Sequence, residues 1–371
     1  MEIADFLKTL SSDFYTGVPD SKLKALCNYL TSEIGIGSHH IIAANEGNAV
    51  GLAAGYHLAT GKVPVVYLQN SGIGNIMNPL CSLLNEKVYG IPCIFVVGWR
   101  GEPGVHDEPQ HVFQGEVSET ILRDLGCLTY VLTAENVEDV LKNNRDEIKR
   151  HLDQGGSVAL LIKQGVLSYD NNPKYKNDFS MTRESILEKI VDCAKDGVIV
   201  STTGKTSREL FEIRERNGQG HEKDFLTVGS MGHSSSIALG IALNKPQKRV
   251  WCIDGDGAAL MHMGAMAVIG SNKPSNMVHV LINNQSHESV GGMPTVAGNV
   301  DMCEVAEACG YPNVYRAEEE EALIKTLSEV EKRHELCFIE VFSAIGSRAD
   351  LGRPTTTPIE NKNSFMKYLQ R

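Results

Sequence analysis

Seven short, continuous apolar runs constrain the fold of this chain more than any other feature. They are rich in Val, Ile and Leu and begin at Val63, Ile91, Ser157, Gly197, Arg249, Met277 and Leu336. Helix-like stretches separate them, including the small-residue segments EGNAVGLAAGYHLA, SSSIALGIAL and LMHMGAMAVIG. Strands that are covered on both faces and joined by helical crossovers give this pattern. The sequence therefore predicts an α/β fold of doubly wound parallel sheets.

A polar segment divides the chain into two blocks of similar size. The chain has 371 residues, enough for about two domains. Hydrophobic periodicity is weakest at SYDNNPKYKNDFS, residues 168–180, which contains Pro173. Such segments are typical of linkers. We expect one domain over residues 1–170 and a second over residues 181–371.

Composition excludes several classes of protein. The net charge of −11 disfavours broad binding to nucleic acid. No apolar run reaches the 18 residues that a membrane-spanning helix needs, and the N-terminal MEIADFLKTL lacks the features of a secretory signal. The nine cysteines form no CxxC pair, so we expect buried thiols in a reducing cytoplasm rather than disulfides, a zinc site or an iron–sulfur cluster.

The strongest motif is a Gly-Asp-Gly turn followed by a pair of asparagines. The strand from Arg249 ends in Gly255-Asp256-Gly257, and the next apolar strand ends in Asn283-Asn284. Neighbouring parallel strands would bring Asp256 and Asn284 to one sheet edge, where a carbonyl near Ser286 adds a third oxygen ligand for Mg²⁺. The two glycines would let a diphosphate approach the backbone. An ordinary turn with a capping aspartate is the alternative.

This spacing of GDG and NN resembles the signature of the thiamine diphosphate-dependent enzymes. The resemblance implies that Asp256, the Asn284 side chain and the Ser286 carbonyl hold Mg²⁺, which bridges to the cofactor's diphosphate. NEGNAVGLAAGYHLATGK looks like the family's Glu-bearing helix, so Glu46 is expected to exchange a proton with the aminopyrimidine ring.

The segment VGSMG, which precedes the GDG motif, also resembles this family. The resemblance places Gly229 beside the pyrimidine and makes Met231 the apolar wedge beneath the cofactor. An ordinary core methionine is the alternative interpretation.

The resemblance covers nearly the whole chain and implies a decarboxylase. The chain has no room for the middle domain of larger members, as in the compact decarboxylases of 3-phosphonopyruvate and 3-sulfopyruvate. Local matches favour the former group, and they are TGVPDS, QNSGIGN, GWRGEPGVHDEPQH, STTGKTSREL and LGRPTTTPIENK. The implied reaction converts 3-phosphonopyruvate to phosphonoacetaldehyde and CO₂. Decarboxylation of sulfopyruvate or another 3-substituted 2-oxo acid is one alternative, and a non-catalytic α/β binding module is another.

The substrate end of the site is expected in loops of both halves. By resemblance, Asp20 and His111 lie over the cofactor as acid–base groups. Further substrate contacts are expected from Ser21, Gln69, Asn70 and His287. A phosphonate also needs a cation, and the candidates are Arg100, Lys205, Arg208, Arg348 and Arg353.

The resemblance also has a consequence for assembly. In this family the pyrimidine-binding domain of one subunit faces the diphosphate-binding domain of another. We therefore expect a homo-oligomer, a dimer or larger, with active sites at subunit interfaces.

Overall fold

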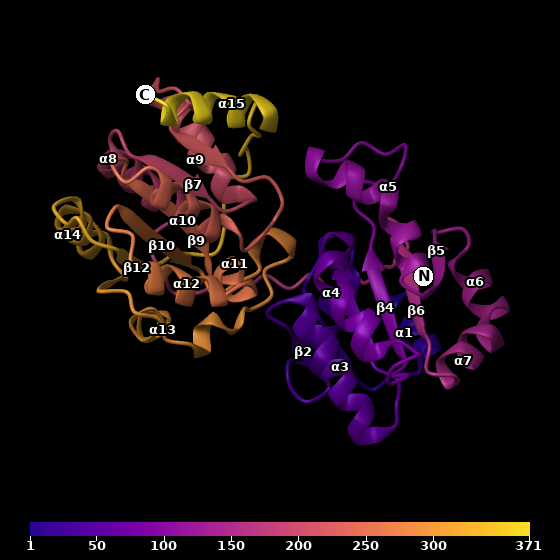
Figure 1. Cartoon of the computed structure of the whole chain (residues 1–371). Helices are drawn as coiled ribbons and strands as arrows, with labels where there is room; N and C mark the ends of the chain where they lie inside the picture. Colours follow the sequence, from indigo (N-terminus) through magenta and orange to yellow (C-terminus); the bar gives the residue numbers. More distant parts are fainter. The chain divides into compact units, whose positions relative to one another are not determined.

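The computed structural model describes all 371 residues and divides into two compact units. The first spans Met1–Lys174 and the second Tyr175–Arg371 (Figure 1). The division falls inside the polar segment 168–180.

The first unit alternates strands with helices. Its strands are β1 (Tyr15–Gly17), β2 (His40–Ile42), β3 (Val65–Gln69), β4 (Cys93–Gly98), β5 (Leu128–Leu132) and β6 (Ser157–Ile162). Its α-helices are α1 (Ile3–Leu10), α2 (Lys24–Tyr29), α3 (Glu46–Thr60), α4 (Ile73–Pro79), α5 (Pro109–Asp124), α6 (Val137–Asn143) and α7 (Arg145–Asp153). The strands form one parallel sheet in the order β2-β1-β3-β4-β6-β5.

The second unit repeats this alternation. Its strands are β7 (Val198–Ser201), β8 (Asp224–Leu226), β9 (Val250–Gly255), β10 (Met277–Asn283), β11 (Asn313–Ala317) and β12 (Cys337–Phe342). Its α-helices are α8 (Arg183–Ala194), α9 (Lys205–Arg216), α10 (Ser234–Asn244), α11 (Asp256–Met261), α12 (Gly264–Asn272), α13 (Met302–Cys309), α14 (Glu320–Glu331) and α15 (Pro358–Leu369). The sheet is parallel, with the order β11-β12-β10-β9-β7-β8.

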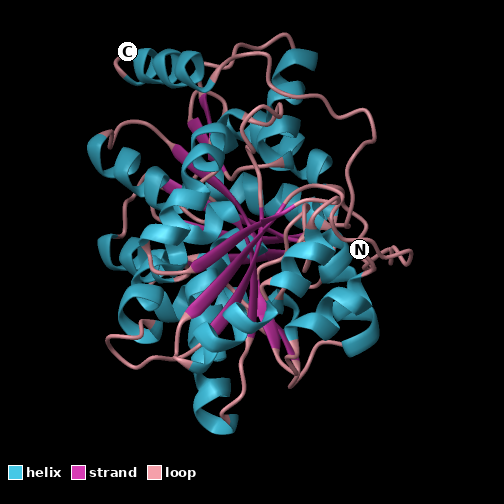
Figure 2. Ribbon diagram, turned by 90° about the vertical axis from the view of Figure 1, so that its right-hand side faces the viewer, coloured by secondary structure: helices cyan, strands magenta, loops and turns pink.

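Both faces of the second sheet are buried. Trp251 and Ile253 of β9 belong to one apolar cluster, whereas Val250 and Cys252 belong to another. Successive side chains of a strand point to opposite faces, so each cluster fills one side of the sheet. Figure 2 shows strands with helices on either side of them. These features confirm the predicted α/β fold with two doubly wound parallel sheets.

Two local expectations need correction. The segment after the GDG turn is not one helix, because His262 and Met263 interrupt it and separate α11 from α12. All nine cysteines are free thiols, but they are not all buried, since Cys81 is exposed. Separately, none of the helices combines the length and the apolar character needed to cross a membrane.

Candidate active site

Two neighbouring strands of the second sheet bring oxygen-bearing side chains to one edge. Asp256 directly follows β9, and Asn284 directly follows β10. The two strands are parallel and hydrogen-bonded to each other, so their carboxyl ends lie side by side. Both side chains are buried. The pairing of β9 with β10 thus brings Asp256 and Asn284 to the same edge of the sheet.

The backbone N–H of Ser286 links Asp256 and Asn284. Burial raises the pKa of Asp256 to about 6. Hydrogen bonds from Thr295 and from backbone N–H groups, including that of Ser286, oppose this increase. The Ser286 N–H also donates to Asn284 Oδ1 at 3.0 Å, and Thr295 Oγ1 donates to Asp256 Oδ2 at 2.5 Å. A carboxylate and an amide oxygen thus approach one point, and these are ligand types that Mg²⁺ prefers.

Three loops meet around Gly257. A β-carbon built on Gly257 would lie 3.3 Å from Met231 Cε and 3.5 Å from the His287 ring. Ser230 and Gln285, in the two partner loops, have φ of 46° and 57°. Left-handed backbone in non-glycine residues is strained and gathers at binding sites. The structure therefore places Met231 and His287 against the GDG turn.

Gly229 belongs to the same loop as Met231. Its N–H donates to Thr203 Oγ1 at 3.0 Å, and its φ is 67°. Gly232, three residues on, has no room for a side chain, because a β-carbon there would lie 2.7 Å from the His262 ring. This close packing holds the loop against the helices that follow the GDG turn.

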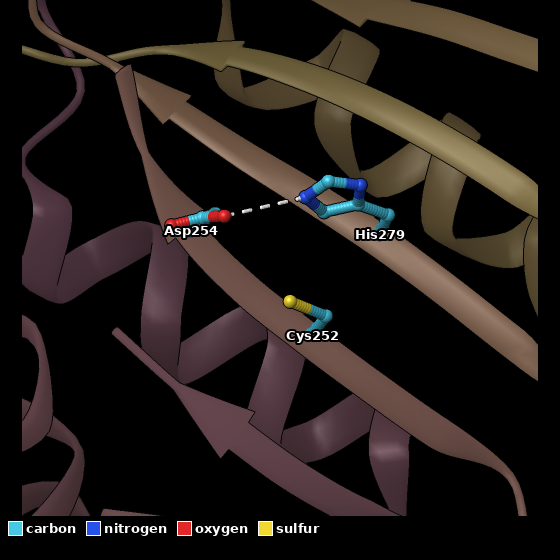
Figure 3. A group of neighbouring side chains, drawn as sticks. All are labelled: Cys252, Asp254 and His279. Carbon is cyan, nitrogen blue, oxygen red and sulfur yellow. Dashed lines mark ion pairs between the residues drawn. The ribbon is translucent and has the colours of Figure 1, made fainter. Parts of the chain in front are cut away.

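A buried side-chain cluster supports this edge from within the sheet. Asp254 and Cys252 project from β9 and His279 from β10 (Figure 3). Asp254 Oδ1 accepts from Gly255 N at 3.1 Å and from Ser234 Oγ at 3.2 Å, while Asp254 Oδ2 lies 3.6 Å from His279 Nε2. Asp254 therefore ties the start of α10 to the GDG turn.

The same cluster is a poor metal site despite its ligand types. The potential ligand atoms of Cys252, Asp254 and His279 lie within 4.8 Å of one another. Burial raises the pKa of the Cys252 thiol well above its ordinary value. Metal ligation by cysteine needs the thiolate. We therefore interpret these side chains as structural.

In the first unit, Glu46 opens helix α3 and points toward residues 70–75, a 3-10 turn followed by the first turn of α4. The helix is capped by Asn45, whose side chain accepts from Asn48 N at 2.9 Å. Asn75 Nδ2 donates to Glu46 Oε2 at 2.7 Å, and a β-carbon on Gly72 would lie only 2.4 Å from Glu46 Oε1. Burial raises the pKa of Glu46, and the bond from Asn75 opposes this shift. The carboxyl thus keeps its proton to a higher pH than an exposed glutamate.

Asp20 is a second buried carboxyl of the first unit. It follows β1, and it accepts from Gln69 Nε2 at 2.5 Å and from Lys22 N at 3.0 Å. Burial raises the pKa of Asp20, whereas these bonds and the charge of Arg100 lower it. A side chain at Gly98, at the end of β4, would occupy the place of the Asp20 carboxyl, so the glycine leaves room for it. Asp20 and Gln69 therefore form one polar unit at the carboxyl edge of the sheet.

Asn70 and Arg100 join the ends of β3 and β4. Asn70 Nδ2 donates to the Arg100 carbonyl at 2.8 Å and to Ser118 Oγ at 2.9 Å, and Asn70 Oδ1 accepts from Arg100 N at 3.1 Å. The Arg100 guanidinium pairs with Asp107, with Nε 2.8 Å from Oδ2, and its Nη1 lies 3.4 Å from Ser21 Oγ. The Asn70 amide thus bridges the segments that follow β3 and β4.

His111 lies in α5, close to this group. Burial and, to a smaller extent, the charge of Arg100 lower its pKa to about 4. Its ring Nδ1 is buried and has no hydrogen-bond partner in the protein. His111 is therefore a neutral imidazole with one ring nitrogen that has no hydrogen-bond partner within the protein.

The remaining cation candidates differ in what they contact. Lys205 pairs with Glu288 at 2.8 Å. Arg208 donates to backbone carbonyls of the loop after β12, and Arg348 is bound by carboxylates of α8 and α9. Arg353 lies exposed in the loop after β12. Lys205 is joined by hydrogen bonds to the Asn284 loop, through Glu288.

Comparison with known proteins identifies the family. Residues 2–122 match the model of the thiamine pyrophosphate enzyme N-terminal TPP binding domain, and residues 202–341 match that of the C-terminal TPP binding domain. Thiamine pyrophosphate is another name for thiamine diphosphate. The chain belongs to the thiamine pyrophosphate enzymes.

Curated relatives in this family align with almost the whole chain. Phosphonopyruvate decarboxylase of Streptomyces viridochromogenes is 33% identical over 95% of this chain and 90% of its own length. Phosphonopyruvate decarboxylase of Streptomyces hygroscopicus is also 33% identical, over 95% of this chain and 89% of its own. Sulfopyruvate decarboxylase of Methanosarcina acetivorans is 27% identical, over 93% and 91% of the two chains.

The site of this thiamine pyrophosphate enzyme includes contacts that the sequence analysis missed. Asn75 and Gly72 both touch Glu46, Thr295 bonds Asp256, and Glu288 bonds Asn284. Only the QNSGIGN match offered a signal, because it contains Asn75 and Gly72. The contact itself depends on the packing of α3 against α4, which a linear motif does not contain.

Proposed function

We propose that this thiamine pyrophosphate enzyme decarboxylates 3-phosphonopyruvate to phosphonoacetaldehyde and CO₂, with Mg²⁺ as a second cofactor. The approach of the Asp256 and Asn284 oxygens around the Ser286 N–H supports cofactor-dependent chemistry. The two relatives named phosphonopyruvate decarboxylase support the substrate, since each aligns with 95% of the chain.

In this proposal the second domain, residues 181–371, holds the diphosphate end. Asp256, the Asn284 side chain and the Ser286 carbonyl bind Mg²⁺. Gly255 and Gly257 leave room for the diphosphate, and Gly229 and Met231 support the cofactor. The buried Asp256, whose pKa is raised to about 6, would be stabilised as a carboxylate by a divalent cation.

The first domain, residues 1–170, receives the pyrimidine end and prepares the chemistry. Bound thiamine diphosphate supplies the electron sink that lets the carboxylate leave the substrate as CO₂. Glu46 holds and returns a proton at the pyrimidine nitrogen, a role that suits a buried carboxyl with a raised pKa. Asn75 and Gly72 fix the direction in which its carboxyl points.

We propose that Asp20 and His111 act as acid–base groups on the substrate. Asp20 keeps its proton more readily than an exposed aspartate, so it suits proton donation. His111 is neutral at ordinary pH, so it suits proton acceptance or hydrogen bonding. Further substrate contacts are proposed for Ser21, Gln69, Asn70 and His287, and phosphonate binding for Arg100, Lys205 and Arg353.

We further propose a cytoplasmic homo-oligomer in which the two kinds of domain meet across subunits. The outward face of α3 offers a surface for such contact, because Gly47, Gly51, Leu52 and Gly55 line a hollow of about 690 Å³ with Phe14 and other residues. Small side chains allow close approach of a second helix. Sizing in solution tests this proposal, and an active monomer contradicts it.

A single assay tests the reaction. Purified protein should release CO₂ from 3-phosphonopyruvate only when thiamine diphosphate and Mg²⁺ are both present. The same assay with sulfopyruvate tests the alternative that the relative from Methanosarcina acetivorans supports. Turnover of neither substrate, with cofactor bound, would favour a non-catalytic module.

A further inference from the structure

Glu288 lies four residues after Asn284 and contacts it directly. Its Oε2 accepts from Asn284 Nδ2 at 3.0 Å and from Arg183 Nη1 at 2.8 Å. Its Oε1 accepts from Lys205 Nζ at 2.8 Å. The Glu288 side chain is only 8% exposed. Both carboxylate oxygens are therefore committed to partners inside the protein.

This contact determines which way the Asn284 amide faces. An ionised carboxylate only accepts hydrogen bonds, so it can bond the NH₂ of the amide but not its carbonyl oxygen. Asn284 Oδ1 must then point away from Glu288, and it lies 3.0 Å from Ser286 N, beside the Asp256 carboxylate. The rotamer with NH₂ toward the proposed Mg²⁺ would place two oxygens against each other.

A buried ion-pair network holds Glu288 in this position. Arg183 donates two hydrogen bonds to Glu209, at 2.7 and 2.8 Å, and the side chains of Arg183 and Glu209 are 8% and 2% exposed. Arg183 thus bridges two carboxylates, and Lys205 pairs with one of them. Two cations and two anions balance in this network, so removal of either carboxylate charge leaves a net positive charge behind the Asn284 loop.

We propose that Glu288 is a positioning residue that turns the Asn284 amide oxygen toward Mg²⁺ and neutralises Arg183 and Lys205 behind the metal. This inference rests on the proposed function, since it concerns the same metal site. Groups that orient metal ligands typically contribute about 10–100-fold to metal affinity.

The test is a Mg²⁺ titration of Glu288→Gln. The substitution keeps the shape of the side chain, but a glutamine amide bonds either end of the Asn284 amide and carries no charge. We expect the Mg²⁺ concentration that half-saturates thiamine diphosphate binding, measured by calorimetry without substrate, to rise about 10–100-fold. At saturating Mg²⁺ the kcat should stay near that of the wild type, because the reacting groups are intact.

Asp224→Asn is the matched control. Asp224 forms a buried pair with Arg214, with bonds of 2.8 Å, in the same unit. Losing this pair should lower thermal stability and leave the Mg²⁺ requirement unchanged. An unchanged Mg²⁺ requirement in Glu288→Gln, or an equal shift in Asp224→Asn, would overturn the inference.

Glu288→Asp provides a second variant if Glu288→Gln does not fold. It keeps the charge, but its side chain is one methylene shorter and cannot span the same contacts, so the Mg²⁺ requirement should also rise; no rise would overturn the inference. A wild-type protein that binds no thiamine diphosphate with Mg²⁺ would overturn the proposed function as well. Wild-type binding with an unchanged variant would overturn this inference alone.

Discussion

The two halves of this chain have the same sheet topology and carry different chemistry. Counted within each unit, both sheets have the strand order 2-1-3-4-6-5. After its third and fourth strands, the first unit presents Gln69 and Arg100, whereas the second presents Asp256 and Asn284. The loops at the carboxyl edge therefore decide what each sheet can bind, and the scaffold alone does not.

The halves also treat buried charge differently. Arg183, Lys205, Glu209 and Glu288 of the second unit compensate one another in a network. Glu46 of the first unit has hydrogen-bond donors for partners and an increased pKa. A compensated network suits a rigid binding site, and a carboxyl with a raised pKa suits proton transfer. We therefore propose that the second half mainly binds the cofactor and that the first half mainly carries the proton chemistry.

The largest expected effect comes from Asp256→Ala. It removes the only carboxylate among the proposed Mg²⁺ ligands, so binding of thiamine diphosphate with Mg²⁺ should weaken by more than about 100-fold, and CO₂ release should fall below detection. Calorimetry and a CO₂ assay measure the two effects. Asp192→Ala, at an exposed position of α8, is the control and should resemble the wild type. Near-normal binding by Asp256→Ala would refute the assignment of binding to the second half.

Glu46→Gln should separate chemistry from binding. It keeps the size of the side chain and removes its acidic proton, so turnover should fall about 10²–10⁴-fold. Thiamine diphosphate binding should change far less, because the diphosphate contacts lie in the second unit. Steady-state kinetics and calorimetry on the same sample check both expectations. Normal turnover would contradict the proton role of the first half.

Gly72→Ala should disturb Glu46 without replacing it. A β-carbon here would lie 2.4 Å from Glu46 Oε1, so the carboxyl must move. A displacement of this kind at a reacting group lowers turnover by about 10–100-fold. Gly74→Ala is the matched control, because a β-carbon there meets nothing within 4 Å. If both variants reduce turnover equally, the position of Glu46 is not what matters.

The smallest effect is on the pH dependence of stability. Because burial raises the pKa of Glu46 in the folded chain, the folded state binds this proton more tightly than the unfolded state. Glu46 therefore contributes to stability at low pH, and this contribution is lost as pH rises from its unfolded pKa through its folded pKa. The loss is about 1.4 kcal/mol for each pKa unit between the two values. In cofactor-free protein, the stability of Glu46→Gln relative to the wild type should increase between pH 4 and pH 8. Thermal unfolding measures this difference, and a constant one would rule out the raised pKa.

The strands that were predicted from the sequence and the strands that were missed occupy different positions in the sheets. All seven apolar runs are strands, and they occupy interior positions of the two sheets. The four edge strands, β2, β5, β8 and β11, were not predicted from the sequence. An edge strand is less completely buried by its neighbours and need not be continuously apolar. β1 is an interior strand, but its three residues, YTG, form no recognisable run.

The sequence by itself determined the parallel α/β architecture, because hydrophobic periodicity is a property of the linear chain. It also determined that Asp256 and Asn284 lie at one sheet edge, because the segment between them has the length of one crossover. Only the tertiary structure decided which groups support these residues. Asn75 and Gly72 meet Glu46, and Arg183 meets Glu288 from 105 residues away. Such contacts arise when segments far apart in the sequence pack together, and no local pattern records them. The orientation of Asn284 depends on the position of Glu288, and the pKa of Glu46 is raised because tertiary packing buries its carboxyl.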